Sequence, residues 1–381
     1  MAEMESMDVL AQRVASMRPE EHGFAYFDPH ASTTARGDLS GWIIPAKDLY
    51  PYAGMPVTYG SQERTEMGHK TEDFVAAYER RGALVPGKSV TSELGLSVDA
   101  EPRGLPAVDN PLWPGHTPGG SSGGAAAMVA RGLVRAAHAS DGGGSIRVPA
   151  AACGLVGFKP ASEPVAVQGF ITTSVADQFL LHQLEPNPAP RSIGLLTEPL
   201  FAETSVQTEW LRAAHEAAES LRAAGHRVVE VSAFPEASQT FEYFTDIFSS
   251  KIARLEHADY LAEFLRERGR QVTPERLAEA RAFSAALPQL LRDFYGVDVL
   301  LNPTIAGDPP RTGAFSSLPP EENFAAQTRW TPWSSLFNIA GAAAISIPWP
   351  VPGRPQPAAV QLGSLTLDDS QLLSLAAELH R

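Results

Sequence analysis

Two glycine clusters that contain serine lie close together in the chain, at Gly119–Gly124 and at Gly142–Ser145. Nucleophilic serine chemistry needs a hydroxyl, a base that removes its proton, and hydrogen-bond donors for the oxyanion that forms. Consecutive glycines let backbone N–H groups turn towards one point and let a carbonyl approach without a Cβ in the way. The second cluster therefore offers Ser145 as the nucleophile, and its glycines as the oxyanion hole: Gly142, Gly143 and Gly144.

The candidate base is a lysine, because no histidine in the chain has a context that distinguishes it. Lys47 follows Gly41–Pro45 (GWIIP), which predicts a short buried strand. A lysine at the end of a buried strand can lose its proton, since burial disfavours the charged form, and can then act as a general base. Ser121 could carry a proton between Lys47 and the nucleophile. Ser122 is the alternative relay, but it is better placed to begin the following helix as its N-cap.

Two other motif patterns overlap these segments. Gly82–Ser89 (GALVPGKS) matches the phosphate-loop pattern, but a helix rather than a strand is predicted before it, and Pro86 has no N–H to offer a phosphate. Gly120–Gly124 fits the nucleophile elbow of α/β-hydrolases, but the preceding stretch, DNPLWPGHTP, is too rich in proline for a central strand. His116, the nearby candidate base for such an elbow, is more typical of a surface loop. These patterns therefore favour neither nucleotide binding nor a histidine-dependent mechanism.

The elements around these residues alternate between helix and strand. Glu209–Ala224 predicts an amphipathic helix that ends at Gly225, and Arg227–Val231 predicts the strand after it. Further elements are predicted as strands at Ala83–Val85, Val134–Ala139, Val297–Leu301, Ala344–Pro348 and Ala359–Leu362, and as helices at Thr71–Arg81, Ser122–Leu133, Phe241–Arg270, Pro274–Tyr295 and Leu367–His380.

This alternation predicts an α/β fold. We expect a single large domain with a central mixed, largely parallel twisted sheet covered by helices on both faces. Residues 1–40 are expected to form an N-terminal helical lead-in, and residues 41–381 the α/β domain.

Composition limits the classes of partner. The chain has 381 residues and a formal net charge of −14, which argues against nucleic-acid binding because that depends on clustered lysine and arginine. No apolar run reaches membrane-spanning length and the N-terminus is too charged for a signal peptide, so we expect a cytoplasmic protein without a membrane partner. Cys153 is the single cysteine and reads as a core thiol, and the ten histidines form no HxH or HExxH pair. We therefore expect neither a metal nor a cofactor.

The stretch Thr117–Pro160 (TPGGSSGG…SDGGGSIRVP…GFKP) resembles the signature segment of the amidase signature family of serine hydrolases. Ala46–Ser61 resembles the family's catalytic-lysine segment. Gly169–Leu184 resembles its post-signature segment, and Val297–Gly313 and Phe337–Gly363 resemble its C-terminal strands. The resemblance covers the chain from about Gly41 to the end.

This resemblance implies a Ser–cis-Ser–Lys triad, in which Ser145 is the nucleophile and Lys47 is the base. Ser121 becomes the bridging serine, with an unusual cis peptide bond before it. The implied enzyme is an amidase that forms an acyl-enzyme and releases a carboxylate and an amine or ammonia. We expect a small-molecule amide as its substrate, and leave open an aryl amide, an anilide, an ester, a carbamate and a homodimeric assembly.

The resemblance also places the acyl pocket, near Asn302–Gly307 and Trp333–Ala342. Its expected substrate-binding residues are Thr304, Trp333 and Phe337. An aromatic wall among small residues suits a compact apolar or aryl acyl group, although both aromatic side chains could equally belong to the core. Asp141 and Arg147 flank the nucleophile, and we expect them to hold its loop as an ion pair rather than to touch substrate.

Two other functions remain open. The A subunit of a glutamyl-tRNA(Gln) amidotransferase resembles the same family but transfers ammonia from glutamine within a multi-subunit complex; the shortened connections of this chain oppose that function. A catalytically inactive binding protein is opposed by the presence of all three triad residues. The chain also departs from the family pattern at Thr173, where an arginine is usual, and in AGAAAIS, where glycine–proline is common.

Overall fold

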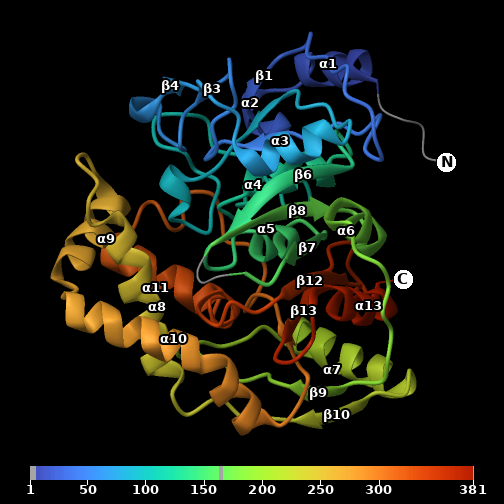
Figure 1. The fold of residues 1–381 in the computed structure, drawn as a ribbon, viewed down its shortest axis with the longest axis vertical. Coiled ribbons are helices and arrows are strands. Elements are labelled where there is room, and N and C mark those ends of the chain that lie inside the picture. The colour runs from blue at the N-terminus through green and yellow to red at the C-terminus, as the bar shows by residue number, and fades with distance from the viewer. Residues whose placement is uncertain (1–5, 163–165, 381) are drawn as a thin grey trace.

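The computed structural model describes residues 6–162 and 166–380. Its largest feature is an eight-stranded sheet with the strand order β10–β9–β11–β13–β12–β7–β8–β6 (Figure 1). The strands are β6 Ala136–Asp141, β7 Val156–Lys159, β8 Val167–Thr172, β9 Ser192–Leu195, β10 Arg227–Glu230, β11 Val299–Pro303, β12 Ala344–Trp349 and β13 Ala358–Ser364. With helices on both of its faces, this mixed sheet confirms the expected α/β class.

The pairing within this sheet is mostly antiparallel, which corrects the expectation of a largely parallel one. In the described residues β9 pairs in parallel with β10 and with β11, whereas the other five pairings are antiparallel. Parallel neighbours need a long crossover, which α7 (Thr208–Ala223) supplies between β9 and β10. Only residues 350–357 connect β12 to β13, and a connection this short joins antiparallel neighbours, so those strands form a hairpin.

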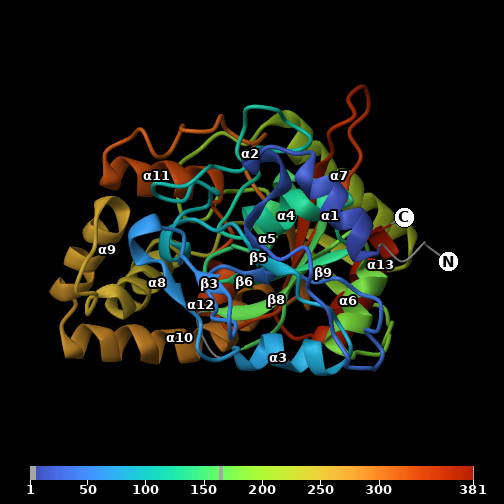
Figure 2. The same ribbon diagram turned by 90° about the horizontal axis from the view of Figure 1, so that it is seen from above.

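Helices cover both faces of the large sheet, and a further set of helices packs together at one side of the molecule. Their bounds are α1 Met7–Ala15, α2 Pro19–His22, α3 Asp73–Arg80, α4 Gly123–Ala130, α5 Arg147–Ala152, α6 Val175–His182, α7 Thr208–Ala223, α8 Ala237–Ile252, α9 Tyr260–Gln271, α10 Pro274–Tyr295, α11 Pro320–Trp330, α12 Leu336–Ile339 and α13 Asp369–Leu379. Helices α8 to α11 gather on one side of the molecule (Figures 1 and 2). In the parts of the chain that the structure describes, no helix is both long and apolar enough to span a membrane.

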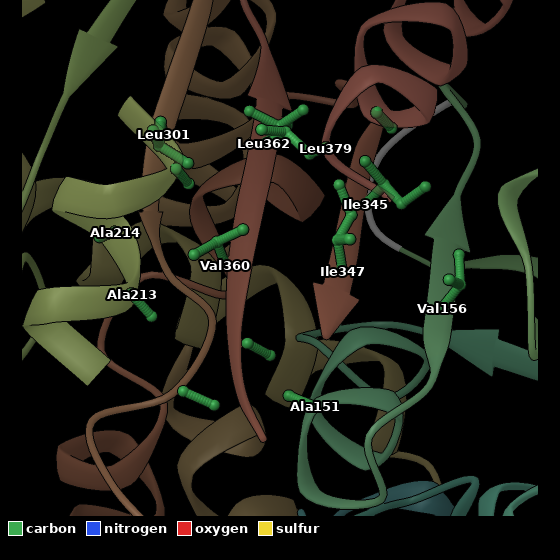
Figure 3. Packing of buried hydrophobic residues seen from close by; sticks show 14 of the residues in the cluster. Ala151, Val156, Ala213, Ala214, Leu301, Ile345, Ile347, Val360, Leu362 and Leu379 are labelled. Carbon is green, nitrogen blue, oxygen red and sulfur yellow. The ribbon is translucent and has the colours of Figure 1, made fainter. Parts of the chain in front are cut away.

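Two hydrophobic clusters cover opposite faces of the sheet. On one face, α5, α7 and α13 pack against strand residues that include Leu301 and Val360 (Figure 3). On the other face, α8, α10 and α12 pack against Leu300 and Ala344. Neighbouring residues of a strand point to opposite faces, so Leu300 and Leu301 belong to different clusters.

The single helix expected over Phe241–Arg270 is divided into α8 and α9. The two helices fold back on each other because Ile252 of the first and Leu261 and Leu265 of the second bury one another in a separate cluster. A hydrophobic pattern at helical spacing does not show such a reversal, since both halves keep the same periodicity.

A small three-stranded sheet positions the lysine segment. Its middle strand, β5 (Gly87–Ser89), pairs antiparallel with β1 (Phe24–Phe27) and parallel with β2 (Ala46–Lys47). The segment before residue 41 therefore contributes a strand as well as helices α1 and α2. The phosphate-loop look-alike, Gly82–Ser89, ends in β5, and its Lys88 is buried 3.4 Å from Asp48. The end of the segment, Gly87–Ser89, is thus a buried strand rather than a loop of free amides.

Candidate active site

Three connections bring the predicted triad residues together. Lys47 ends β2, Ser121 lies in the loop before α4, and Ser145 lies between β6 and α5. The Nζ atom of Lys47 is 2.8 Å from Ser121 Oγ, and the Gly120–Ser121 peptide bond is cis. The N–H of Ser122 donates to the carbonyl oxygen of Ser145 at 3.3 Å, so the two serine loops lie against each other.

Ser122 is the N-cap of α4 by position, as its sequence context predicts. Its hydroxyl, however, does not bond to the first turn of the helix. It donates to the carbonyl oxygen of Ser140 at 3.3 Å and accepts from the N–H of Ser140 at 3.4 Å. The side chain therefore fastens the loop to β6, while the neighbouring Ser121 hydroxyl faces Lys47.

The environment of Lys47 favours a neutral amine. Its side chain is fully buried, and burial lowers its pKa from 10.5 to about 7, although the negative charge of Asp141 acts in the opposite direction. Besides Ser121, Nζ lies 3.1 Å from Ser140 Oγ and 3.4 Å from the carbonyl oxygen of Ser140. A substantial fraction of this lysine can therefore accept a proton near neutral pH.

His138 holds the backbone of Lys47 in place. Its Nδ1 accepts the Lys47 N–H at 3.1 Å, and its Nε2 lies 2.9 Å from the side-chain oxygen of Gln168. Nε2 therefore carries the proton, and both ring nitrogens are occupied. Burial, together with the nearby charge of Lys47, lowers the pKa of His138 to about 3.

Sequence reasoning missed both side chains of β6 that contact Lys47. His138 and Ser140 are two residues apart on that strand, so they point to the same face. The available signal was the alternation of side chains along the strand that ends at Asp141, which places His138 and Ser140 on one face. It could not be used without knowing that β2 lies against β6.

The loop that holds Ser145, the predicted nucleophile, is built around the carboxylate of Asp141. The carboxylate accepts the N–H of Gly144 at 2.7 Å and that of Ile146 at 3.2 Å. Arg147 donates to both of its oxygens at 2.9 Å. Burial alone would raise the pKa of Asp141, but the charge and hydrogen bonds of Arg147 outweigh it and hold that pKa well below its usual range.

One N–H group of the expected oxyanion hole already has a partner within the loop. Because the N–H of Gly144 is committed to Asp141, it is not free for a substrate oxygen. The donors that remain in the loop are the N–H groups of Gly142, Gly143 and Ser145. Gly144 is required for its backbone, with φ of +121° and with Ser334 only 2.8 Å from where a Cβ would stand.

Arg147 is a structural residue, in line with the ion pair expected from the sequence. Besides Asp141 it donates to the carbonyl oxygen of Ser334 at 2.9 Å, to Gln361 Oε1 at 2.7 Å and to Asn338 Oδ1 at 2.8 Å. With the two bonds to the carboxylate, all of the N–H groups of a guanidinium are used. None is left for a substrate.

A cavity that is partly open to solvent lies beside Ser145. Gly142, Gly143 and Ser145 form one part of its lining. The rings of α8 and α11 form another: Phe241, Phe244, Phe248 and Phe324. In the described residues, no group of three or more histidine, cysteine, aspartate or glutamate side chains could hold a metal ion.

The three residues that the sequence suggested for substrate binding lie elsewhere. Trp333 and Phe337 are about 1% exposed and belong to the core on the α8 face of the sheet, where the Trp333 ring N–H donates to the carbonyl oxygen of Glu198 at 2.7 Å. The hydroxyl of Thr304 is buried 3.0 Å from Ser346 Oγ. None of the three is among the described residues that line the cavity. The expected segment Trp333–Ala342 contributes Ser335 to that lining.

The phenylalanines that do line the cavity were missed. Phe241, Phe244 and Phe248 share one face of α8, which the sequence showed only as a helix with apolar spacing. A helix shows the same spacing of apolar residues whether its apolar face packs on a sheet or borders a cavity. The sequence therefore could not tell these rings from core residues.

Comparison with known proteins adds independent information. A family model described as Amidase matches residues 22–179 and 171–373. "Putative amidase AmiB2" of Mycobacterium tuberculosis (strain ATCC 25618 / H37Rv) is 32% identical over 379 residues, which cover 90% of this chain and 82% of that protein.

Among solved structures, 6-aminohexanoate cyclic dimer hydrolase superposes with a TM-score of 0.86 at 24% identity, covering 98% of this chain and 92% of that one. The A subunit of the glutamyl-tRNA(Gln) amidotransferase from Thermotoga maritima superposes with a TM-score of 0.75 at 21% identity, covering 98% of this chain and 94% of that one. At these identities the two structures show a shared fold.

Proposed function

The chain belongs to the amidase family, and we propose that it hydrolyses a small carboxamide through an acyl-enzyme on Ser145, with Ser121 as proton relay and Lys47 as base. The observation that carries this proposal is the buried contact of 2.8 Å between Lys47 Nζ and Ser121 Oγ. A lysine whose pKa burial lowers to about 7 supplies a base that works at neutral pH.

In the first half-reaction, neutral Lys47 takes the hydroxyl proton of Ser121 while Ser121 takes that of Ser145. The Ser145 oxygen then bonds to the amide carbon, and the negative charge that develops on the carbonyl oxygen is held by N–H groups of Gly142, Gly143 and Ser145. The proton on Lys47 returns through Ser121 to the leaving nitrogen as the C–N bond breaks. Amine or ammonia departs and leaves the acyl group on Ser145.

In the second half-reaction, water takes the place of the amine. Its proton passes through Ser121 to Lys47 as its oxygen attacks the acyl carbon, and then returns to Ser145 as the ester bond breaks. The products are the carboxylic acid and the free enzyme. Esters, carbamates and anilides are reasonable substrates for the same steps, because each presents a carbonyl carbon with a leaving heteroatom that the relay can protonate.

Glutamine-dependent ammonia transfer is less well supported than simple hydrolysis. Glutamine brings an ammonium and a carboxylate, both of which need charged or hydrogen-bonding partners when they are buried. The described residues that line the cavity carry no charged side chain. We therefore favour a neutral amide over glutamine.

The test is release of ammonia or amine from a panel of amides by the isolated chain and its variants. We expect Ser145→Ala and Lys47→Ala to lose several orders of magnitude in kcat, and Ser238→Ala, which changes an exposed serine, to retain activity. A fluorophosphonate probe should label Ser145, as read by peptide mapping. An adduct on another residue, or substantial turnover by pure Ser145→Ala, would refute the assignment.

A further inference from the structure

The cavity beside Ser145 is bordered by a series of nearly parallel rings. The planes of Phe241 and Phe244 differ by 22° with ring centroids 6.0 Å apart, and those of Phe244 and Phe248 by 17° at 5.6 Å. Phe324 continues the series from α11, at 24° and 6.1 Å from Phe241. Offset, near-parallel rings at such distances are a favourable arrangement for aromatic groups, and a further planar ring can join them in the same orientation.

These rings lie directly against the loop of the nucleophile. A Cβ placed on Gly143 would stand 3.2 Å from the ring of Phe244, and one on Gly142 would stand 3.9 Å from the ring of Phe248. The N–H groups of these two glycines are among those available to hold the carbonyl oxygen. A group attached to the carbonyl carbon on this side must therefore pass over Phe244 and Phe248.

The leaving group belongs to a different part of the cavity. Gly95 also lines it, and a Cβ on Gly95 would stand 3.2 Å from Ser121 Oγ. Because Ser121 must deliver a proton to the leaving nitrogen, that nitrogen lies near Gly95. The phenylalanine side is then left for the acyl group.

Three polar residues of the cavity, Gln327, Thr328 and Thr331, already have hydrogen-bond partners within the protein. Thr331 Oγ1 donates to the carbonyl oxygen of Gln327, and Thr328 Oγ1 to that of Phe324, both at 2.9 Å. The side chain of Gln327 accepts the N–H of Val98 at 2.8 Å and donates to Asn323. The hydroxyl protons of both threonines and the side-chain oxygen of Gln327 are thus engaged, so these three residues stabilise a polar or charged acyl group less than free partners would.

We infer that the phenylalanine-lined cavity binds an aromatic acyl group, which makes the substrate an aryl carboxamide whose ring lies against Phe244 and Phe248. The inference rests on the proposed function for the identity of the nucleophile. The methyl group of acetamide would contact the rings over far less surface than an aryl group, and the charges of glutamine would be left without partners among them.

The first test compares kcat/KM for benzamide, acetamide and glutamine. We expect the wild type to prefer benzamide over both others by at least about tenfold, the scale on which an apolar pocket discriminates. Phe248→Ala should lower the benzamide-to-acetamide ratio by about tenfold or more, and Phe248→Leu should lower it less because it retains apolar volume. Phe294→Ala, which removes an exposed ring on α10, should leave the ratio unchanged. Preference for acetamide or glutamine, or a ratio that Phe248→Ala does not alter, would overturn the inference.

The second test separates this inference from the proposed chemistry. Calorimetric titration of Ser145→Ala with benzamide and with acetamide measures binding without turnover. We expect tighter binding of benzamide, and loss of that preference when Phe248→Ala is added. Should the wild type hydrolyse no amide while this pattern holds, the proposed function fails and the aryl site stands. Equal binding of the two amides by a folded Ser145→Ala protein would reject the aryl site and leave the nucleophile assignment intact.

Discussion

Lys47 Nζ and Ser121 Oγ lie 2.8 Å apart, although the two residues are separated by 74 positions in the chain. Strand β2 brings Lys47 to this point by pairing with β5, and the Lys47 N–H is fixed on His138 of β6. The lysine has no exposed surface, so its charge is governed by burial rather than by solvent. Its ionisation should consequently be visible both in the rate and in the stability of the protein.

The rate should depend on pH through Lys47. As the proposed base, Lys47 acts only when it is neutral, and burial lowers its pKa to about 7. We therefore expect kcat/KM to rise as pH increases through about 7 and to level off at mildly alkaline pH, since kcat/KM reports ionisations of the free enzyme. Initial rates across this range with a neutral amide give the profile. A flat profile would assign the base to another group.

Stability should show the same ionisation with a defined sign. The pKa of Lys47 is about 7 in the folded protein, below its ordinary value of 10.5, so between these values the unfolded chain binds more protons than the folded one. This lysine therefore makes the wild type gain stability as pH rises through that interval. Lys47→Met removes the effect.

The stability gain of the variant is its free energy of unfolding minus that of the wild type. This difference should accordingly be largest at about pH 7 and should decrease towards about pH 9.5. Urea unfolding of both proteins at the two pH values measures it. A difference that stays constant with pH would mean that Lys47 keeps its ordinary pKa in the folded state.

Gly95 should be needed to keep the relay in place. A Cβ at this position would stand 2.7 Å from Leu49 Cδ1 and 3.2 Å from Ser121 Oγ, and φ is +70°. We expect Gly95→Ala to reduce kcat by about a hundredfold, the scale on which displacing a reacting group by about 1 Å acts. Gly132→Ala is the matched control, because Gly132 has φ of +63° but an added Cβ would meet open space there. Equal loss of kcat in the two variants would attribute the effect to backbone strain alone.

Arg147 should stabilise the fold through Asp141. Both side chains are fully buried, and Arg147→Met leaves the carboxylate without its partner. We expect a loss of about 3–5 kcal/mol in the free energy of unfolding, as for other buried pairs that lose one member. Denaturant titration at neutral pH measures it. Arg212→Met, which changes a half-exposed arginine on α7, should stay within about 0.5 kcal/mol of wild type.

Much of this protein follows from local sequence. The amphipathic pattern of Glu209–Ala224 gives the length of α7 to within a residue, because helical periodicity and a terminal glycine act over a few neighbouring positions. The glycine cluster ending at Ser145, with Asp141 before it and Arg147 after it, likewise forms within one short loop. Its residue types and spacing were enough to suggest a nucleophile and an ion pair beside it.

Tertiary structure decided what the apolar face of each helix and strand packs against. Trp333 and Phe337 turn into the core, whereas Phe248 borders the cavity and Phe244 belongs both to the core and to the cavity lining. All four are apolar residues in or beside helices. The commitment of the Gly144 N–H to Asp141 and the mostly antiparallel order of the sheet were equally invisible in the sequence. Periodicity tells which residues share a face of a helix or strand. Only long-range packing, which depends on every other element at once, determines what that face is set against.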